Sequence, residues 1–452
     1  MTSLIAMRRN KILFVCPSSS PVGGLQTWLD ELCRGMAGRG WDPVVALVHG
    51  PFTHDSVSYK VAHPDLQTVI IDGSALTQGA RVREVMRMIK RIQPEFFIPL
   101  TVIDAHDAVC HMKHSGLDGL RYVLSVHGNM PQQLADARLF QAFADVSINP
   151  GVLTCRMMEW LGMPANRIFH APNGIAIRSS TYRRSSPANV MRLAYVGRLT
   201  DEDKRVMDLV PLTAALDATG IAYHLDIVGS GPCEVRLRKL LSTAAVEFHG
   251  FIESELLHRE FYPQWDVLLL FSQSEAFGLA LIEAMMHGVV PVSSQFIGSR
   301  AERFLIDRET ARLFPIGDIT ECARIIEQLA SKRSDLTDMS EKARSFVTST
   351  YSWVRCVEDW QHALMQSREF PSRSLPAQAP RSIDEGHSLA GRFPWLPRVC
   401  SDQFYKLKRR LLGIPEAIRQ GEEWPYHTGL WSNRDLEQIT AVTTEMDLRC
   451  AE

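Results

Sequence analysis

One repeating order of elements dominates the sequence: a short run of β-branched or apolar residues, a turn rich in glycine, proline and serine, and then an amphipathic stretch. The first unit has an apolar run over residues 11–16, a loop over residues 17–24 and a helical pattern over residues 25–38. Such alternation is typical of βαβ units, in which helices cover both faces of a parallel sheet. The pattern therefore predicts an α/β protein with doubly wound parallel sheets.

The pattern restarts near the middle of the chain, which indicates two domains. A polar linker over residues 183–189 precedes a new strand pattern over residues 191–197. We expect one Rossmann-like domain over residues 1–185, a second over residues 186–352, and a ligand-binding cleft between them. Further strands are expected at residues 43–48, 68–71, 96–100, 122–126, 146–148, 223–228, 246–248, 267–271 and 289–293.

The last part of the chain differs in composition from the rest. Residues 371–397 contain five prolines and no clear periodicity. Residues 368–410 carry nine basic against four acidic side chains, whereas residues 411–452 carry three against eight. We interpret residues 369–452 as a proline-rich linker and a charge-split tail with a short solvated helical cap. A membrane or partner signal is the alternative.

Composition excludes several classes of protein. The 452 residues carry a formal net charge of -2, so the chain lacks the basic character of a general nucleic-acid binder, and no nucleic-acid partner is expected. The nine cysteines show no zinc-ligand spacing, and we expect no metal and no cofactor. No apolar run reaches the ~18 residues that span a bilayer. The apolar stretch at the amino terminus is too short for the hydrophobic region of a signal peptide. We therefore expect a cytoplasmic protein.

A basic amphipathic pattern over residues 81–91 bears on membrane contact. Its usual origin is a Rossmann helix with a solvated basic face, which is our interpretation. Peripheral contact with the inner face of the membrane is the alternative.

The strongest chemical signal is a pair of carboxylates, Glu275 and Glu283, which flank seven residues of the types Ala, Phe, Gly, Leu and Ile. Carboxylates in such apolar surroundings need hydrogen-bond donors, and the ribose hydroxyls of a nucleotide provide two. A helix that begins nearby would offer the free amides of Phe277, Gly278 and Leu279 to a diphosphate. An isolated Glu would instead be a helix cap or an exposed side chain; the surrounding motif favours the nucleotide site.

Two further motifs could bind phosphates. Arg198 and Lys204 lie at the two ends of a loop after a predicted strand, where cations would stabilise a leaving diphosphate. Three acids between them support a surface ion-pair cluster equally well. Gly23 and Gly24 open a helix after the first strand, where the backbone can approach phosphates, although a simple tight turn is an equal alternative. Their spacing disfavours both a dinucleotide fingerprint and a P-loop.

A histidine ends another predicted strand. His127 lies at the carboxyl end of the strand at residues 122–126, where open α/β sheets bind ligands. Its imidazole could orient a hydroxyl or donate to a developing charge, whereas a structural role is the alternative.

Together these segments resemble the retaining glycosyltransferases of family four, which have the GT-B architecture of two facing Rossmann-like domains. The resemblance runs from about residue 11 to residue 364 and is most specific in the Glu-x-Phe-Gly…Glu pattern of residues 275–283. It implies catalytic roles for His127, Arg198, Lys204 and Glu275, and donor-binding roles for Gly23, Gly24, Phe277, Gly278, Leu279 and Glu283.

The resemblance also implies details of the fold. The segment over residues 353–368 is similar to the closing helix of the family, which crosses back onto the first domain. Two positions depart from the family pattern. Arg205 stands where glycine is common, and Ala176 stands where an acid is often found.

The reaction implied by the resemblance is transfer of a glycosyl unit from a nucleoside-diphosphate sugar with retention at the anomeric carbon. Cations would stabilise the diphosphate in place of a metal, and the acceptor would be a glycan, a lipid-linked compound or a small molecule. We expect acceptor contacts in amino-domain loops such as residues 101–119. The alternatives are a GT-B nucleotide-sugar epimerase and a non-catalytic nucleotide-sugar-binding partner in polysaccharide assembly.

Overall fold

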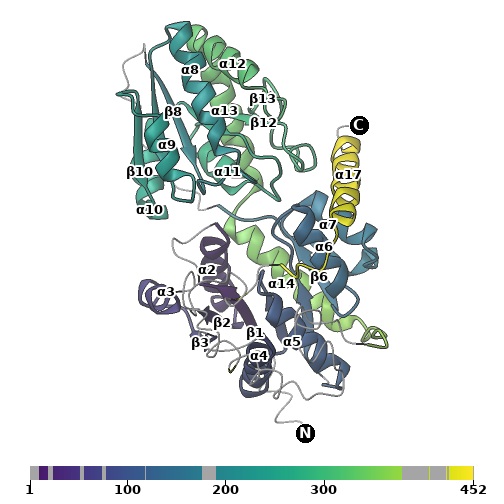
Figure 1. The fold of residues 1–452 in the computed structure, drawn as a ribbon. Helices are drawn as coiled ribbons and strands as arrows, with labels where there is room; N and C mark the ends of the chain where they lie inside the picture. Colours follow the sequence, from purple (N-terminus) through teal and green to yellow (C-terminus); the bar gives the residue numbers. More distant parts are fainter. Residues whose placement is uncertain are drawn as a thin grey trace.

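The computed structural model of the chain describes residues 10–18, 24–50, 55–73, 78–117, 119–175, 190–378, 407, 424 and 427–450. It contains two α/β domains, one above the other in Figure 1, with one helix crossing between them. Gly23, Ala176, the linker over residues 183–189 and most of the proline-rich segment lie outside the described residues.

The amino-terminal domain has a seven-stranded sheet in the order β3-β2-β1-β4-β5-β6-β7 with parallel pairing throughout. Its strands are β1 (Lys11–Pro17), β2 (Asp42–His49), β3 (Thr68–Asp72), β4 (Phe96–Pro99), β5 (Arg121–Leu124), β6 (Val146–Asn149) and β7 (Ile168–His170). Its helices are α2 (Gly24–Ala37), α3 (Ser56–Ala62), α4 (Gln78–Ile92), α5 (Ile103–His114), α6 (Pro131–Phe140) and α7 (Val152–Trp160). The central strands are buried on both faces, which explains their nearly continuous apolar sequence.

The carboxyl-terminal domain has a six-stranded parallel sheet in the order β10-β9-β8-β11-β12-β13. Its strands are β8 (Met191–Val196), β9 (Tyr223–Val228), β10 (Val246–Gly250), β11 (Val267–Leu270), β12 (Val290–Ser294) and β13 (Arg312–Phe314). Its main helices are α8 (Leu209–Thr219), α9 (Glu234–Leu240), α11 (Leu279–Met286), α12 (Ile319–Ser331) and α13 (Arg333–Thr350). Short helical turns include η4 (Tyr262–Gln264). The predicted doubly wound α/β pair is confirmed.

The helix α14 (Trp353–Glu369) crosses from the second domain onto the first (Figure 1). It packs against α2 so closely that a Cβ added at Gly35 would lie 2.4 Å from Val357 Cγ2. Near its end, Arg368 Nε donates to Glu95 Oε1 at 2.7 Å. The chain segments that join the domains meet where the Ile175 amide donates to the Tyr351 carbonyl at 3.3 Å. The domain boundaries given above stay predictions.

The carboxyl-terminal segment is packed onto the protein, so the expectation of a solvated helical cap is wrong for the residues that the structure describes. Its helix, α17 (Asn433–Arg449), lies beside α6 and α7 (Figure 1). Trp424 is 2% exposed and donates from Nε1 to the His49 carbonyl at 2.9 Å. Buried side chains recur every four residues along α17, at Ile439, Thr443 and Asp447. This spacing places them on one face of the helix, which the sequence pattern did not reveal.

The basic face expected over residues 81–91 is solvated at Lys90 and Arg91, which are exposed, but differs at Arg81. Arg81 on α4 is 2% exposed and donates from Nε to Asp104 Oδ2 at 2.6 Å, and its guanidinium lies over the Trp424 ring at 5.6 Å. Arg81 is therefore part of the packed interior and not of a solvated face. None of the helices in the described ranges combines the length and hydropathy needed to cross a membrane.

Candidate functional site

The candidate residues of the second domain follow two adjacent strands. Strands β8 and β11 pair in parallel, and the order of the sheet reverses between them. Arg198 and Lys204 follow β8, whereas Glu275 follows β11. Ligands of open α/β sheets bind beyond the carboxyl ends of strands at such a reversal. The topology thus brings Lys204 and Glu275, which are 71 residues apart in the chain, to one edge of the sheet.

Lys204 and Glu275 form the centre of this site. Lys204 Nζ donates to Glu275 Oε1 at 2.5 Å, and the Ser272 hydroxyl donates to the same oxygen at 2.7 Å. The side chains of Lys204 and Glu275 are only 17% and 14% exposed. This partial burial strengthens the ion pair and holds both groups in one geometry.

Arg198 lies at the exposed rim of the site. Its side chain is 67% exposed, and Nη2 donates to Asp203 Oδ2 at 2.7 Å. Burial alone would raise the pKa of Asp203, but the Thr200 hydroxyl and the Arg198 guanidinium lower it below the usual value. Each cation therefore has an acidic partner, so both the diphosphate clamp and the ion-pair cluster fit this arrangement.

The residue after Lys204 keeps a glycine-like backbone. Arg205 has a φ of 48°, in the left-handed region that favours glycine. Its guanidinium is held by Asp208, with Nε 2.8 Å from Oδ2. The departure from the family pattern therefore changes the side chain and leaves the loop in a conformation that suits glycine.

The amino terminus of α11 offers backbone amides. Gly278 has a φ of 74° and directs the chain into α11, whose first residue is Leu279. The Leu281 amide donates to the Gly278 carbonyl at 2.9 Å, so the amides of the residues before Leu281 precede the first intrahelical bond. Phe277 is 3% exposed and packs edge-on against Tyr351 at 5.2 Å. Its side chain belongs to the core, and only its backbone is left for donor binding.

The first domain faces this helix with the start of α2. A Cβ added at Gly24 would lie 3.3 Å from Leu279 Cδ1. Two residues predicted for donor binding thus meet across the boundary between the domains. Gly23 lies outside the described residues.

Glu283 lies on α11 with its side chain 20% exposed. The Tyr262 hydroxyl of η4 donates to Glu283 Oε2 at 2.9 Å, and His258 Nε2 lies 3.8 Å from Oε1. Burial, followed by the charge of Glu283, raises the pKa of Tyr262 well above its usual value, so Tyr262 stays a donor. These contacts hold the Glu283 carboxylate in place. The alternative, in which Glu283 is an exposed side chain without a binding role, does not describe this arrangement.

His127 is half-buried at the carboxyl end of β5, with its ring 4.3 Å from that of Trp28. Burial lowers the pKa of His127 to about 3, so the ring is neutral near pH 7. The Ser125 hydroxyl donates to the Ile148 carbonyl at 2.7 Å and can then only accept from His127 Nε2 at 2.9 Å. This network assigns the proton to Nε2 and leaves Nδ1 as an acceptor.

Asn129 connects the two domains, and sequence reasoning missed it. Its Nδ2 donates to the Glu275 carbonyl at 2.8 Å, while its Oδ1 accepts from the Thr154 hydroxyl at 2.7 Å. The only signal in the sequence was its position two residues after His127, at the end of a predicted strand. A polar side chain in such a turn is too common to be singled out.

Most of the segment over residues 101–119 is helical, so the expectation of an irregular loop there is wrong. Residues 103–114 form helix α5, and His106 is 5% exposed inside the domain. Its Nδ1 lies 2.6 Å from the Tyr122 hydroxyl, and its ring stacks on Phe140 at 4.9 Å. The expectation failed because the helix is buried on most sides and so lacks amphipathic periodicity.

The burial of His106 predicts a measurable loss of stability in acid. Burial lowers the pKa of His106 to about 3, against 6.5 ordinarily. Between these values the unfolded chain binds one more proton, so this group makes the free energy of unfolding fall as the pH falls, by up to about 1.4 kcal/mol per pH unit. Urea unfolding of His106→Gln between pH 5 and 7 should show a shallower decrease. His114→Gln, an exposed change on the same helix, should leave the slope unchanged; equal slopes in all three proteins would contradict the assignment.

One group of potential metal ligands occurs elsewhere in the described part of the chain. His224 and Asp226 on β9 and Glu247 on β10 offer ligand atoms within 4.8 Å of one another. However, Asp226 Oδ2 already accepts from Trp265 Nε1 at 2.7 Å, and Oδ1 lies 2.6 Å from His249 Nε2. Hydrogen bonds therefore account for this group without an ion.

Family comparisons agree with this arrangement. Residues 182–346 match the model of glycosyl transferases group 1, and residues 22–178 match the model of glycosyltransferase family 4. The chain belongs to the family 4 glycosyltransferases. Its two parallel sheets are accordingly those of the GT-B fold.

Curated relatives of this family 4 member are distant. A sulfoquinovosyl transferase of Arabidopsis thaliana is 30% identical over 166 residues, which are 35% of this chain and 30% of the relative. The N-acetyl-alpha-D-glucosaminyl L-malate synthase of Bacillus anthracis is 29% identical over 159 residues, which are 35% of this chain and 41% of the relative. The matched segments thus span less than half of these relatives.

Solved structures with the same fold cover more of the chain. HepE of Anabaena, solved with UDP and glucose, has a TM-score of 0.63 at 16% identity and covers 79% of this chain and 100% of its own. Sucrose-phosphate synthase of Thermosynechococcus elongatus has a TM-score of 0.65 at 17% identity and covers 79% and 99%. At such identities these likenesses show the fold.

Proposed function

We propose that this protein transfers a glycosyl unit from a nucleoside-diphosphate sugar to an acceptor hydroxyl, with retention at the anomeric carbon. The observation that carries the proposal is the ion pair of Lys204 and Glu275, at 2.5 Å, beside the amino terminus of α11. A cation and free backbone amides at one edge suit a diphosphate. The adjacent carboxylate suits the hydroxyls of a sugar.

The bond changes assign a task to each group. The bond between the anomeric carbon and the phosphate oxygen breaks, and the acceptor oxygen bonds to the same carbon on the same face. The acceptor proton passes to the departing phosphate oxygen, so no side chain of the protein has to take it. Lys204, Arg198 and the α11 amides stabilise the charge that builds on the diphosphate, in place of a metal.

The neutral His127 fits a positioning contact on the first domain. Its Nδ1 is an acceptor, because Nε2 donates to the Ser125 hydroxyl. An acceptor nitrogen can bind a hydroxyl of the donor sugar from the amino-terminal side of the cleft.

Names of similar proteins support a nucleotide sugar as donor. HepE was solved with UDP-glucose, and a mannosyltransferase of Mycobacterium tuberculosis, 27% identical over 181 residues, is named as GDP-mannose-dependent. These names differ in base and in sugar, so a panel of donors is required. The acceptor classes to include are glycans, lipid-linked compounds and small molecules, with lipid vesicles to test peripheral membrane contact.

The deciding experiment incubates the purified protein with each nucleotide sugar and follows release of the nucleoside diphosphate with and without acceptors. Acceptor-dependent release, with an unchanged anomeric configuration by NMR, supports the proposal; inversion overturns the retaining mechanism. Epimerised sugar formed without an acceptor would show the epimerase alternative. Binding of a donor by calorimetry without turnover on any acceptor would show the non-catalytic partner, and binding of no donor at all would overturn the proposal.

Glu283 allows a separate prediction for donor binding. If Glu283 binds the ribose hydroxyls, Glu283→Gln should weaken binding of the nucleoside diphosphate by about 10-fold, the effect of losing a charged hydrogen-bond acceptor. Calorimetry with the nucleoside diphosphate measures this. Glu327→Gln on the exposed face of α12 is the control. Unchanged affinity in Glu283→Gln would remove Glu283 from the donor site.

A further inference from the structure

The helix α17 lies beyond the residues that the two family models match, which are 22–178 and 182–346. The Anabaena and Thermosynechococcus structures, nearly all of whose own chains are covered, match 79% of this chain. The described residues of the carboxyl-terminal segment nevertheless make specific contacts with both domains. A segment that a fold does not require but that is buried against two domains calls for a function of its own.

The amino-terminal domain anchors this segment through a buried carboxylate. Asp136 on α6 is 5% exposed and accepts from the Trp431 indole and the Thr428 amide at 3.0 and 3.2 Å. Arg156 on α7 donates from Nη1 to Cys450 Sγ at 2.7 Å. Because buried carboxylates need their donors, the anchor is specific.

The carboxyl end of α17 also binds the carboxyl-terminal domain. Asp447 is 1% exposed and accepts from the Arg300 amide at 3.2 Å and from Arg300 Nη1 at 3.1 Å. Arg303 Nη2 donates to the Cys450 carbonyl at 3.4 Å. Both arginines belong to residues 295–304, which we term the bridging loop. Figure 1 shows α17 with its carboxyl end toward the upper domain.

The bridging loop supports the backbone of Glu275. The Glu275 amide donates to the Ile297 carbonyl at 3.2 Å, and the Ile297 amide donates to the Gln273 carbonyl at 2.9 Å. A Cβ added at Gly298 would lie 2.5 Å from the Glu275 carbonyl oxygen and 3.0 Å from Asn129 Nδ2. A shift of the loop therefore moves the segment that carries Glu275 and its contact with Asn129.

We infer that α17 is an interdomain clasp and that Asp447 is a positioning residue for the proposed transferase reaction. Through Arg300 and the bridging loop, Asp447 keeps the two domains in the arrangement that places Glu275 against Asn129. The inference rests on the proposed function for its effect on catalysis, but the clasp itself does not. When the clasp is broken, the fraction of molecules with a closed cleft falls, and the apparent affinity for the donor falls with it.

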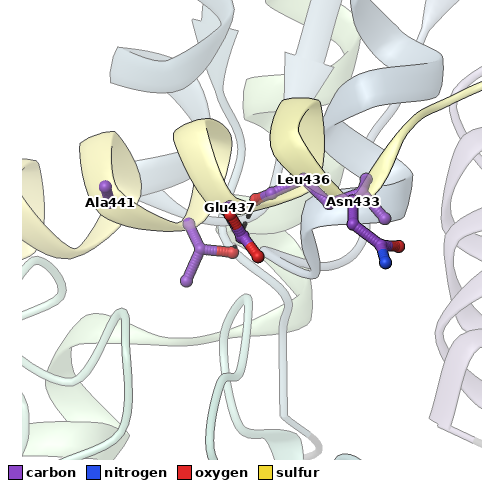
Figure 2. Close-up of a pocket in the computed structure, with 5 residues that line it drawn as sticks. Asn433, Leu436, Glu437 and Ala441 are labelled. Carbon is purple, nitrogen blue, oxygen red and sulfur yellow. Dashed lines mark hydrogen bonds between the residues drawn. The ribbon is translucent and has the colours of Figure 1, made fainter.

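The opposite face of α17 provides a control. Beside it, Asn433, Leu436, Glu437, Thr440 and Ala441 of the same helix line a pocket (Figure 2). The Thr440 hydroxyl donates to the Leu436 carbonyl of the same helix at 2.8 Å, so this group needs no partner from elsewhere. On the exposed side near the end of α17, Glu445 forms an ion pair with Arg449. Glu445→Gln thus changes the same type of charge, two residues from Asp447, without touching a domain.

The test compares Asp447→Asn with Glu445→Gln in the full-length protein. Asparagine keeps the shape of Asp447 and removes the charge that binds Arg300. Hydrogen exchange without any ligand should become faster in residues 273–279 and in the bridging loop, and small-angle scattering should show a larger radius of gyration. With the donor found in the panel, KM should rise by about 10-fold while kcat changes less than about threefold. If Asp447→Asn folds poorly, the double variant Asp447→Asn with Arg300→Gln replaces it, because this variant removes both charges and leaves neither unpaired. The double variant should show the same rise in KM.

The outcomes separate the clasp from simple packing and from the proposed function. Faster exchange confined to α17, with residues 273–279 and KM unchanged, would overturn the inference. Faster exchange in both segments together with no activity on any nucleotide sugar would keep the clasp and reject the proposed function. Equal behaviour of the Asp447 and Glu445 variants would also overturn the clasp.

Discussion

Replacing Lys204 by methionine is expected to lower kcat with a nucleotide sugar by about 10²–10³-fold, the usual effect of removing one preorganised electrostatic stabiliser. Methionine keeps the apolar stem and removes only the charge. The effect is expected to be large because the Lys204 side chain is 17% exposed and already held by Glu275. Release of the nucleoside diphosphate at saturating donor and acceptor measures it.

Two further variants test the reason for this effect. Lys239→Met, an exposed change on α9, should behave as the wild type. Arg198→Met should lower kcat by only about tenfold, because its side chain is 67% exposed and its charge is weakened by water. Turnover of Lys204→Met close to that of the wild type would eliminate the diphosphate clamp.

Replacing Gly151 by alanine is expected to lower kcat/KM by about 10²-fold with little change in melting temperature. A Cβ at Gly151 would lie 2.5 Å from the Ala276 carbonyl oxygen of the other domain. The φ of Gly151 is -113°, which alanine adopts without strain, so the severe conflict lies across the domain boundary. Within its own domain the added Cβ would lie 3.1 Å from Thr154 Oγ1, which a small shift of that side chain relieves. Displacement of the catalytic groups by about 1 Å is enough for a loss of this size.

The control for this variant is Gly38→Ala, whose Cβ would lie an ordinary 3.6 Å from the carbonyl oxygens of Arg34 and Gly35. It should keep full activity. Thermal unfolding of both variants checks that the domains are intact. A Gly151→Ala protein with unchanged kcat/KM would show that the closed arrangement is not the reacting one.

Much of the architecture could be predicted because it depends on local patterns. The alternation of apolar runs and amphipathic stretches located β1, β8 and β9 to within one residue, since the burial of a strand on both faces shows in its own sequence. Helix α5 was missed because a helix is recognised in a sequence by its polar face. This helix is buried on most sides and has no polar face to mark its period.

The candidate site could also be predicted only in part. The motifs identified Lys204 and Glu275 as chemical candidates, but their 2.5 Å contact depends on the pairing of β8 with β11. Phe277 belonged to the same motif, yet its side chain turned out to pack in the core. Asn129 was not predicted because its partner, the Glu275 carbonyl, is 146 residues away.

By itself, the sequence determined the two doubly wound α/β domains, and it singled out the segments that we propose carry the chemistry. All of these follow from residues that are near one another in the chain, where periodicity and turn chemistry act. Only the tertiary structure decided which of those segments meet, that Arg81 is buried under Trp424, and that Asp447 of α17 binds Arg300. Such contacts depend on the relative positions of whole elements, and no local pattern of residues records them.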